Sequence, residues 1–98
     1  PIDYDDDVSN DNFLDDLNNL KSLPLSDLAL IVKQNWGKPN IYFGAKPYLE
    51  AMEYLDSIND SYGLDSGKSV VAYFLANAQT WKGEVAREVK KELNRRLK

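Results

Sequence analysis

Proline and glycine divide this chain of 98 residues into short segments in which apolar residues recur every three or four positions. This period places the apolar side chains on one face of a helix, whereas hardly any stretch alternates as a half-buried β-strand does. The sequence therefore predicts an all-α fold, a compact bundle of about five helices. The expected helices cover residues 13–20, 26–36, 47–58, 68–80 and 81–97.

The helix expected over residues 68–80 is apolar on most sides, which indicates a central position in the bundle. We predict four deeply buried residues in it, namely Val71, Phe74, Leu75 and Ala78. The segment 40–47 has a brief strand-like look but no evident partner strand. We expect it to be a loop that leads to Pro47 in the first turn of a helix.

The stretch GLDSGKSVV, residues 63–71, approaches the phosphate-binding loop of an ATPase, G-x-x-x-x-G-K-[ST]. The spacing between its glycines is one residue short, because Tyr62 stands where the first glycine should be. No apolar strand precedes the stretch, although a P-loop requires a strand, a loop and a helix in succession. We therefore interpret it as a helix start, in which Asp65 or Ser66 caps the free amides of the first turn.

The sequence contains neither cysteine nor histidine. It therefore lacks a thiolate nucleophile, the commonest general base near neutral pH and the commonest metal ligand. No pair of acidic residues stands at a convincing catalytic spacing, so an enzyme is the least favoured class. We predict a non-catalytic protein without catalytic residues, metal site or cofactor.

The longest apolar runs, LALIV and VVAYFLA, are much shorter than the roughly 20 residues of a membrane-spanning helix. No basic region followed by an apolar region marks a secretory signal near the N-terminus. We therefore expect no membrane contact and a cytoplasmic location.

Charge is distributed unevenly along the chain. Residues 1–62 have a formal charge of −8 and residues 63–98 a charge of +4, although the whole chain has a charge of only −4. Residues 1–12 are acidic, polar and poor in apolar side chains, a composition typical of a solvated, disordered arm. We predict an acidic arm over residues 1–12 and a single helical domain over residues 13–98.

The last expected helix carries a basic strip. At about 100° per residue, Arg87, Lys91, Arg95 and Lys98 lie opposite its apolar face. One interpretation is a solvated face, because cations near a helix C-terminus favour the macrodipole and the neighbouring glutamates supply surface pairings. The other is an anion-binding strip for nucleic acid or an acidic protein.

Aromatic residues form a second candidate surface. Trp36, Tyr42 and Phe43 surround the loop at residues 37–39, and Tyr48, Tyr54 and Tyr62 are candidates to join them. We expect most of these rings to pack in the core, since a Trp at a helix end usually fills the gap between two helices. Two or more rings exposed together would instead be able to stack on a ligand or to form a hot spot at a protein interface.

Two blocks of sequence carry a resemblance to a known family. They read NIYFGAKPYLEAM and LDSINDSYGLDSGKSVVAYFLANAQTWKGEVAREVKKELNRRLK, and their distinctive phrases are YFGAxPYLEAM and YFLANAxTWxGEVAR. They resemble small proteins and domains from phages, plasmids and integrated elements of Gram-positive bacteria, a family with no established activity. The resemblance covers roughly the last two-thirds of the chain. It implies a mobile-element setting and assigns no catalytic residue.

These observations favour a protein–protein interaction module of a phage or mobile element. The candidate partner-binding residues are Trp36, Tyr42, Phe43, Arg87, Lys91 and Arg95. The alternative is a nucleic-acid-binding accessory protein that uses the basic face of the C-terminal helix. The low isoelectric point of about 4.7 disfavours this alternative, because dedicated DNA binders concentrate more positive charge. The sequence leaves the oligomeric state open.

Overall fold

Four α-helices and a two-stranded hairpin make up residues 19–98, the part of the chain that the computed structural model describes. The helices are α2 (Leu25–Trp36), α3 (Lys46–Met52), α4 (Gly67–Ala76) and α5 (Glu84–Leu97). The antiparallel strands are β1 (Ser61–Tyr62) and β2 (Asp65–Ser66). Three 3₁₀ turns are η1 (Leu20–Ser22), η2 (Lys38–Asn40) and η3 (Phe43–Ala45). Of the predicted all-α bundle of about five helices, a mostly helical globule is confirmed for these residues, but it has four α-helices and includes a hairpin.

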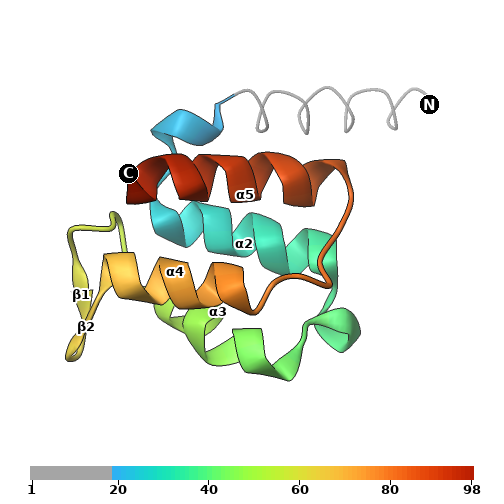
Figure 1. Ribbon diagram of the computed structural model, residues 1–98, viewed down its shortest axis with the longest axis horizontal. Helices are drawn as coiled ribbons and strands as arrows, with labels where there is room; N and C mark the ends of the chain where they lie inside the picture. The colour runs from blue at the N-terminus through green and yellow to red at the C-terminus, as the bar shows by residue number, and fades with distance from the viewer. Residues whose placement is uncertain (1–18) are drawn as a thin grey trace.

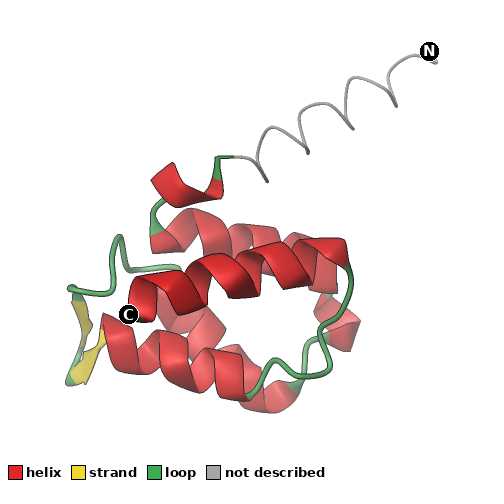
Figure 2. Ribbon diagram, turned by 45° about the horizontal axis from the view of Figure 1, so that its top comes forward, coloured by secondary structure: helices red, strands yellow, loops and turns green. Residues whose placement is uncertain are grey.

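The four helices contact one another in a closed cycle, in which α2 packs on α5, α5 on α4, α4 on α3 and α3 on α2. Figure 1 shows α5 along one side of the molecule and α3 on the opposite side, behind α4. The hairpin projects at one end, next to the start of α4, as Figure 2 also shows. No single helix is therefore enclosed by the other three within residues 19–98.

The prediction of a central fourth helix is wrong for this reason. Val71 and Phe74 are fully buried, as is Ala78 just beyond α4, but Leu75 is only partly buried. The opposite face of α4 exposes Tyr73, together with Ala72 and Ala76. This helix has one buried face and one exposed face, although both are apolar.

Trp81 fills the centre of the core from the loop between α4 and α5. Its side chain is 1% exposed, and its indole Nε1 donates a hydrogen bond of 2.9 Å to Asn35 Oδ1 on α2. Lys90 Nζ on α5 donates to the backbone oxygen of Trp81 at 2.6 Å. The burial of Trp81 holds the loop against the bundle, so α5 begins only after Gly83, whose φ of 114° disfavours other residues.

The segment 55–60 provides backbone acceptors for the first turns of two helices. The amides of Leu25 and Ser26 in α2 donate to the carbonyls of Asp56 and Leu55, at 3.0 and 2.8 Å. The amides of Gly67 and Lys68 in α4 donate to those of Asp60 and Ile58, at 2.6 and 3.0 Å. This segment therefore satisfies amides that a helix start would otherwise leave for water or an anion.

Several predicted helix boundaries require correction. The last helix begins at Glu84 instead of at residue 81, because the Trp81 ring is packed in the core. The third helix ends at Met52, and the fourth ends at Ala76. The expected loop over residues 40–47 contains η3 and leads into α3 with Pro47 in its first turn, as predicted. The hairpin was not predicted.

Two other expectations fall largely on residues before Asn19. The acidic arm over residues 1–12 lies outside the described residues, and so does nearly all of the helix expected over residues 13–20. Of the expected range 13–20, the structure describes only Asn19 and Leu20, and Leu20 is buried in the first position of η1.

Candidate partner-binding surfaces

Trp36, one of the predicted binding residues, lies in the core. Its side chain is buried, stacks on Trp81 with ring centroids 5.8 Å apart, and meets Phe74 edge-on at 6.5 Å. This confirms the core-packing interpretation for Trp36. It leaves Trp36 out of any surface that the described residues form.

Tyr42 and Phe43, the next two predicted residues, are exposed together. Phe43 is 75% exposed and Tyr42 is 43% exposed, and their ring centroids lie 4.9 Å apart. Tyr42 precedes η3 and Phe43 begins it, and the next buried residue is Ala45. The short 3₁₀ turn therefore presents both rings outward while its last residue anchors it in the core.

The same surface continues onto α4. A Cβ atom at Gly44 would lie 2.6 Å from the Tyr42 ring and 2.9 Å from Asn77 Oδ1, so the Tyr42 ring and Asn77 lie against the same backbone position. Asn77 Nδ2 donates to the backbone oxygen of Tyr73 at 2.9 Å, and the Tyr73 ring stacks on Tyr48 at 5.4 Å. We call Tyr42, Phe43, Tyr48 and Tyr73 the aromatic surface.

Tyr73 is the member of this surface that the sequence analysis missed. It is 57% exposed on α4, one turn before Ala76 and Asn77. These two residues line a shallow hollow together with Tyr42, Gln79 and Thr80. The signal was present in the sequence, because Tyr73 lies about 200° around the helix from Val71 at 100° per residue. The uniformly apolar run VVAYFLA concealed it.

The other candidate aromatic residues gather at the hairpin. Tyr54 and Tyr62 stack on each other at 5.7 Å, and both are exposed. Leu64, at the turn of the hairpin, is fully exposed. Among the ring contacts of the described residues, none joins this pair to Tyr42, Phe43 or Tyr73.

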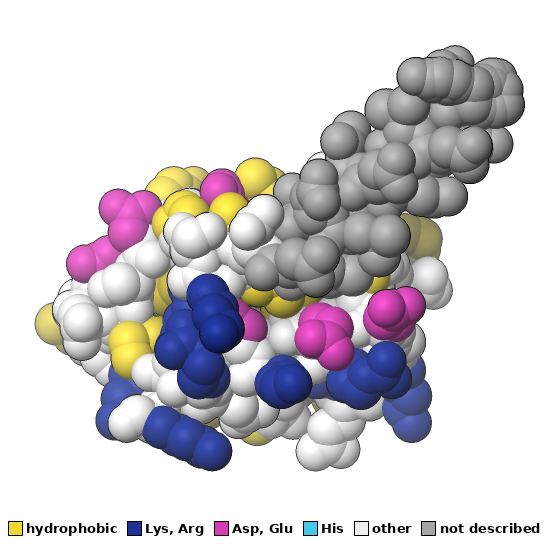
Figure 3. Space-filling model, turned by 90° about the horizontal axis from the view of Figure 1, so that it is seen from above, with side chains coloured by type: hydrophobic (Ala, Val, Ile, Leu, Met, Phe, Trp, Pro, Cys, Tyr) yellow, Lys and Arg dark blue, Asp and Glu magenta, His cyan; other side chains and the backbone are white. Residues whose placement is uncertain are grey.

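The predicted basic strip lies on the exposed face of α5. Arg87, Lys91, Arg95 and Lys98 are all exposed, as the helical period indicates. Figure 3 looks onto the side of the molecule formed by α5 and shows Lys and Arg side chains along it, with a few carboxylates between them. The strip is therefore a real surface feature, but it is interrupted by negative charge.

Glu92 neutralises part of this strip. Its carboxylate accepts two hydrogen bonds from Arg95, at 2.9 and 2.6 Å, and one from Arg96 Nε at 2.6 Å, although the Glu92 side chain is only 6% exposed. The hydrogen bonds from Arg95 lower the pKa of Glu92, and the hydrogen bond and charge of Arg96 lower it further. Burial of the carboxylate acts in the opposite direction but is outweighed. Hydrogen bonding to Glu92 raises the pKa of Arg95 in turn.

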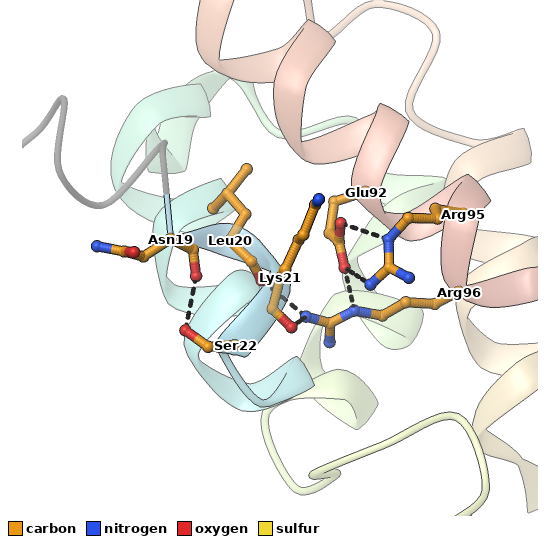
Figure 4. A network of polar contacts seen from close by, with 7 residues as sticks. All are labelled: Asn19, Leu20, Lys21, Ser22, Glu92, Arg95 and Arg96. Atoms are coloured by element: carbon orange, nitrogen blue, oxygen red, sulfur yellow. Dashed lines mark hydrogen bonds and ion pairs between the residues drawn. The ribbon is translucent and has the colours of Figure 1, made fainter.

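Arg96 has a structural role in the described part of the chain. Its Nη2 donates to the backbone oxygens of Leu20 and Lys21, at 2.7 and 3.3 Å, and thereby fastens η1 to α5 (Figure 4). Lys90 is committed too, since it binds the Trp81 carbonyl and lies 5.8 Å from the Trp81 ring. Burial, and then the charge of Lys82, lower the pKa of Lys90.

The start of α4 does not form a phosphate-binding loop. The Ser66 hydroxyl accepts a hydrogen bond of 3.0 Å from the Ser69 amide, which confirms the capping interpretation of GLDSGKSVV. The amides of Gly67 and Lys68 donate to backbone carbonyls. The amides that would surround a phosphate in a P-loop are therefore occupied by the protein itself.

The described residues contain no group of three or more acidic side chains that could hold a metal ion. Over residues 19–98, none of the helices combines the length and the apolar character that crossing a bilayer requires. Comparison of the chain with protein-family models, curated proteins and solved structures finds no match. The resemblance to mobile-element proteins therefore stays a prediction.

Proposed function

We propose that this protein is a non-catalytic protein–protein interaction module and that its partner protein binds the aromatic surface. The observation that carries the proposal is the joint exposure of Phe43, Tyr42 and Tyr73, which come from two elements that Asn77 links. The Asn77 side chain lies beside Gly44 and donates a hydrogen bond to the Tyr73 backbone oxygen. Large aromatic side chains are enriched among residues that dominate binding energy at protein interfaces. The aromatic surface is shallow, so it suits a protein better than an enclosed small molecule.

The proposal extends to the setting of the protein. The resemblance of its last two-thirds to proteins of phages and mobile elements supports a role in such an element, in the cytoplasm. The structure also supports binding at the aromatic surface. Ala45 and Leu49, on either side of Tyr48, are buried and hold the backbone beneath the rings in place. A rigid base lets exposed rings bind without a large loss of conformational entropy.

The basic face of α5 supports the nucleic-acid alternative less well. Binding to a phosphate backbone requires several cations that are free to replace counterions. Arg95 and Arg96 are bound to Glu92, and Arg87 has Glu88 at 3.9 Å. The remaining positive charge is too sparse for a continuous phosphate track.

The test is affinity capture with the full chain from a lysate of the cells that make it, with nuclease treatment. We expect the unchanged protein to retain a protein partner, and Phe43→Ala and Tyr73→Ala each to reduce its retention about tenfold or more, as loss of a hot-spot ring does. Tyr54→Ala is the matched control, because Tyr54 is also an exposed ring, 76% exposed, but lies in the other cluster.

Two outcomes would overturn the proposal. One is a partner whose retention is unaffected by Phe43→Ala and Tyr73→Ala in variants with unchanged circular dichroism. The other is capture of DNA or RNA that disappears with nuclease and with substitution of Lys91 and Arg95, which would establish the nucleic-acid alternative instead.

A further inference from the structure

A groove lies between η1 and the C-terminal half of α5. Leu20 and Lys21 line it from η1, and Lys91, Arg95 and Lys98 are among the residues that line it from α5. Figure 4 shows how the chain at Leu20 and Lys21 lies beside the helix that carries Glu92, Arg95 and Arg96. The groove thus joins two segments that are about 70 residues apart in sequence and that Arg96 holds together.

Three cations around this groove have no ion-pair partner within residues 19–98. They are Lys21, Lys91 and Lys98, and all three are exposed. The two carboxylates on the same groove, Glu88 and Glu92, already face arginines. The free charge of the groove is therefore positive, which suits an acidic ligand.

The chain itself contains an acidic segment at the right place. Residues 19–98 contain all 12 basic residues and nine of the 16 acidic residues, whereas residues 1–18 contain the other seven acidic residues and no basic one. The described chain begins at Asn19, directly before the two groove residues of η1. The molecule thus consists of a positively charged globule with a strongly acidic segment attached at the edge of its basic groove.

We propose that this groove binds an acidic polypeptide segment and that residues 1–12 of the same chain occupy it. Five aspartates supply the negative charge, namely Asp3, Asp5, Asp6, Asp7 and Asp11. Residues 13–18 link them to Asn19. As part of the helix expected over residues 13–20 this link spans about 9 Å, and the ten residues 3–12 reach about 33 Å when extended. The groove follows α5 from Glu88 to Lys98, which corresponds to roughly 15 Å of helix. The arm is therefore long enough to place its aspartates along the whole groove.

Because the arm is attached at the edge of the groove, weak ion pairs between the two are sufficient to keep it bound. Exposed ion pairs are individually weak and screened by salt. An attached segment, however, has an effective concentration in the millimolar range, so several such pairs can keep the groove occupied. Any other anionic ligand must then displace the arm. This inference does not depend on the proposed function, because the aromatic surface lies on η3, α3 and α4 instead of on α5.

The test uses the full chain with one spin label. The protein has no cysteine, so Ser9→Cys gives a single labelling site inside the acidic segment. We expect the label to enhance the relaxation of backbone amides at Lys91, Arg95 and Lys98 at low ionic strength. This enhancement should fall at 1 M salt to the level that the tether alone produces, because the screening length there is about 3 Å.

A neutral arm is the matched control for the tether. Changing the five aspartates to asparagine removes the negative charge but keeps the length and attachment of the arm. Any relaxation enhancement in this variant is then due only to the closeness of the tethered label. We expect enhancement on α5 to fall to this level with Lys91→Glu and Lys98→Glu together, but not with Lys46→Glu, an exposed lysine on α3. Equal enhancement with acidic and neutral arms, or enhancement centred on α3 and α4, would overturn the proposal.

Discussion

At the scale of single residues, Glu92 is notable because its charged carboxylate is buried. Glu92 is the one buried charged residue among residues 19–98. Its carboxylate accepts its hydrogen bonds from Arg95 and Arg96. A carboxylate removed from water is stable only when its oxygens are hydrogen-bonded and its charge is balanced. The network is therefore a structural element that joins α5 to η1 through Arg96.

We predict that Glu92→Gln reduces the free energy of unfolding at neutral pH by about 1–3 kcal/mol, because charge-assisted hydrogen bonds are replaced by neutral ones. Since folding lowers the pKa of Glu92, its contribution is complete above the pKa of the unfolded chain. That contribution is lost as the pH falls through the lower pKa of the folded protein. Urea unfolding at a series of pH values measures both effects.

Glu88→Gln is the control for this measurement, because Glu88 faces Arg87 only at 3.9 Å. We expect it to change stability by less than about 0.5 kcal/mol. If Glu92→Gln retained the same acid sensitivity as the unchanged protein, the assignment of this sensitivity to Glu92 would be incorrect.

Residue patterns in the sequence predicted these features unequally. The pairing of Glu92 with the nearby arginines follows from helical spacing and is confirmed, but its burial depends on η1, which is distant in sequence. The expectation that most of the candidate rings pack in the core is wrong, because Phe43, Tyr42, Tyr54 and Tyr62 are exposed. A Phe before a glycine can fill the core or leave it, and here Ala45 takes the inward position.

At the scale of elements, the start of α4 depends on the absence of a side chain at Gly67. This residue is buried, and a Cβ atom there would lie 2.8 Å from the Ser57 oxygen and 3.0 Å from both the Asp60 oxygen and Ile58 Cα. These are backbone atoms, so they cannot be relieved by a change of rotamer. The glycine that resembles a P-loop residue thus serves the packing of α4 against the preceding segment.

We therefore predict that Gly67→Ala lowers the free energy of unfolding by about 1–3 kcal/mol, the usual cost of overpacking. Lys68→Ala is the neighbouring control, and we expect it to change stability by less than about 0.5 kcal/mol because the side chain is exposed. Thermal unfolding followed by circular dichroism compares the two. A stable Gly67→Ala protein would mean that the segment 57–60 moves aside easily.

The element boundaries show where sequence periodicity reaches its limit. The existence and order of α2, α3, α4 and α5 follow from apolar spacing and from breaks at proline and glycine. The start of α5 does not, because Trp81 continues the apolar pattern but its ring is required between Asn35 and Trp36. The hairpin is equally hidden, since two-residue strands have no period to detect.

At the scale of the whole molecule, two surfaces of different chemistry lie on different helices. The aromatic surface belongs to η3, α3 and α4, and the basic groove belongs to η1 and α5. Figure 1 places α5 and α3 on opposite sides of the bundle. Binding at one surface therefore leaves the other accessible, and substitutions in the two can be combined without direct contact.

The shared acceptor segment, residues 55–60, leads to a prediction about how the folded protein opens. Its carbonyls hold the amides of Leu25, Ser26, Gly67 and Lys68, which belong to two different helices. A fluctuation that detaches the segment frees all four amides at once, so they should exchange with deuterium at a common opening free energy. Gly67→Ala should accelerate exchange at Leu25 and Ser26 as well as at the start of α4. Unchanged protection of Leu25 in that variant would show that the two helices open independently.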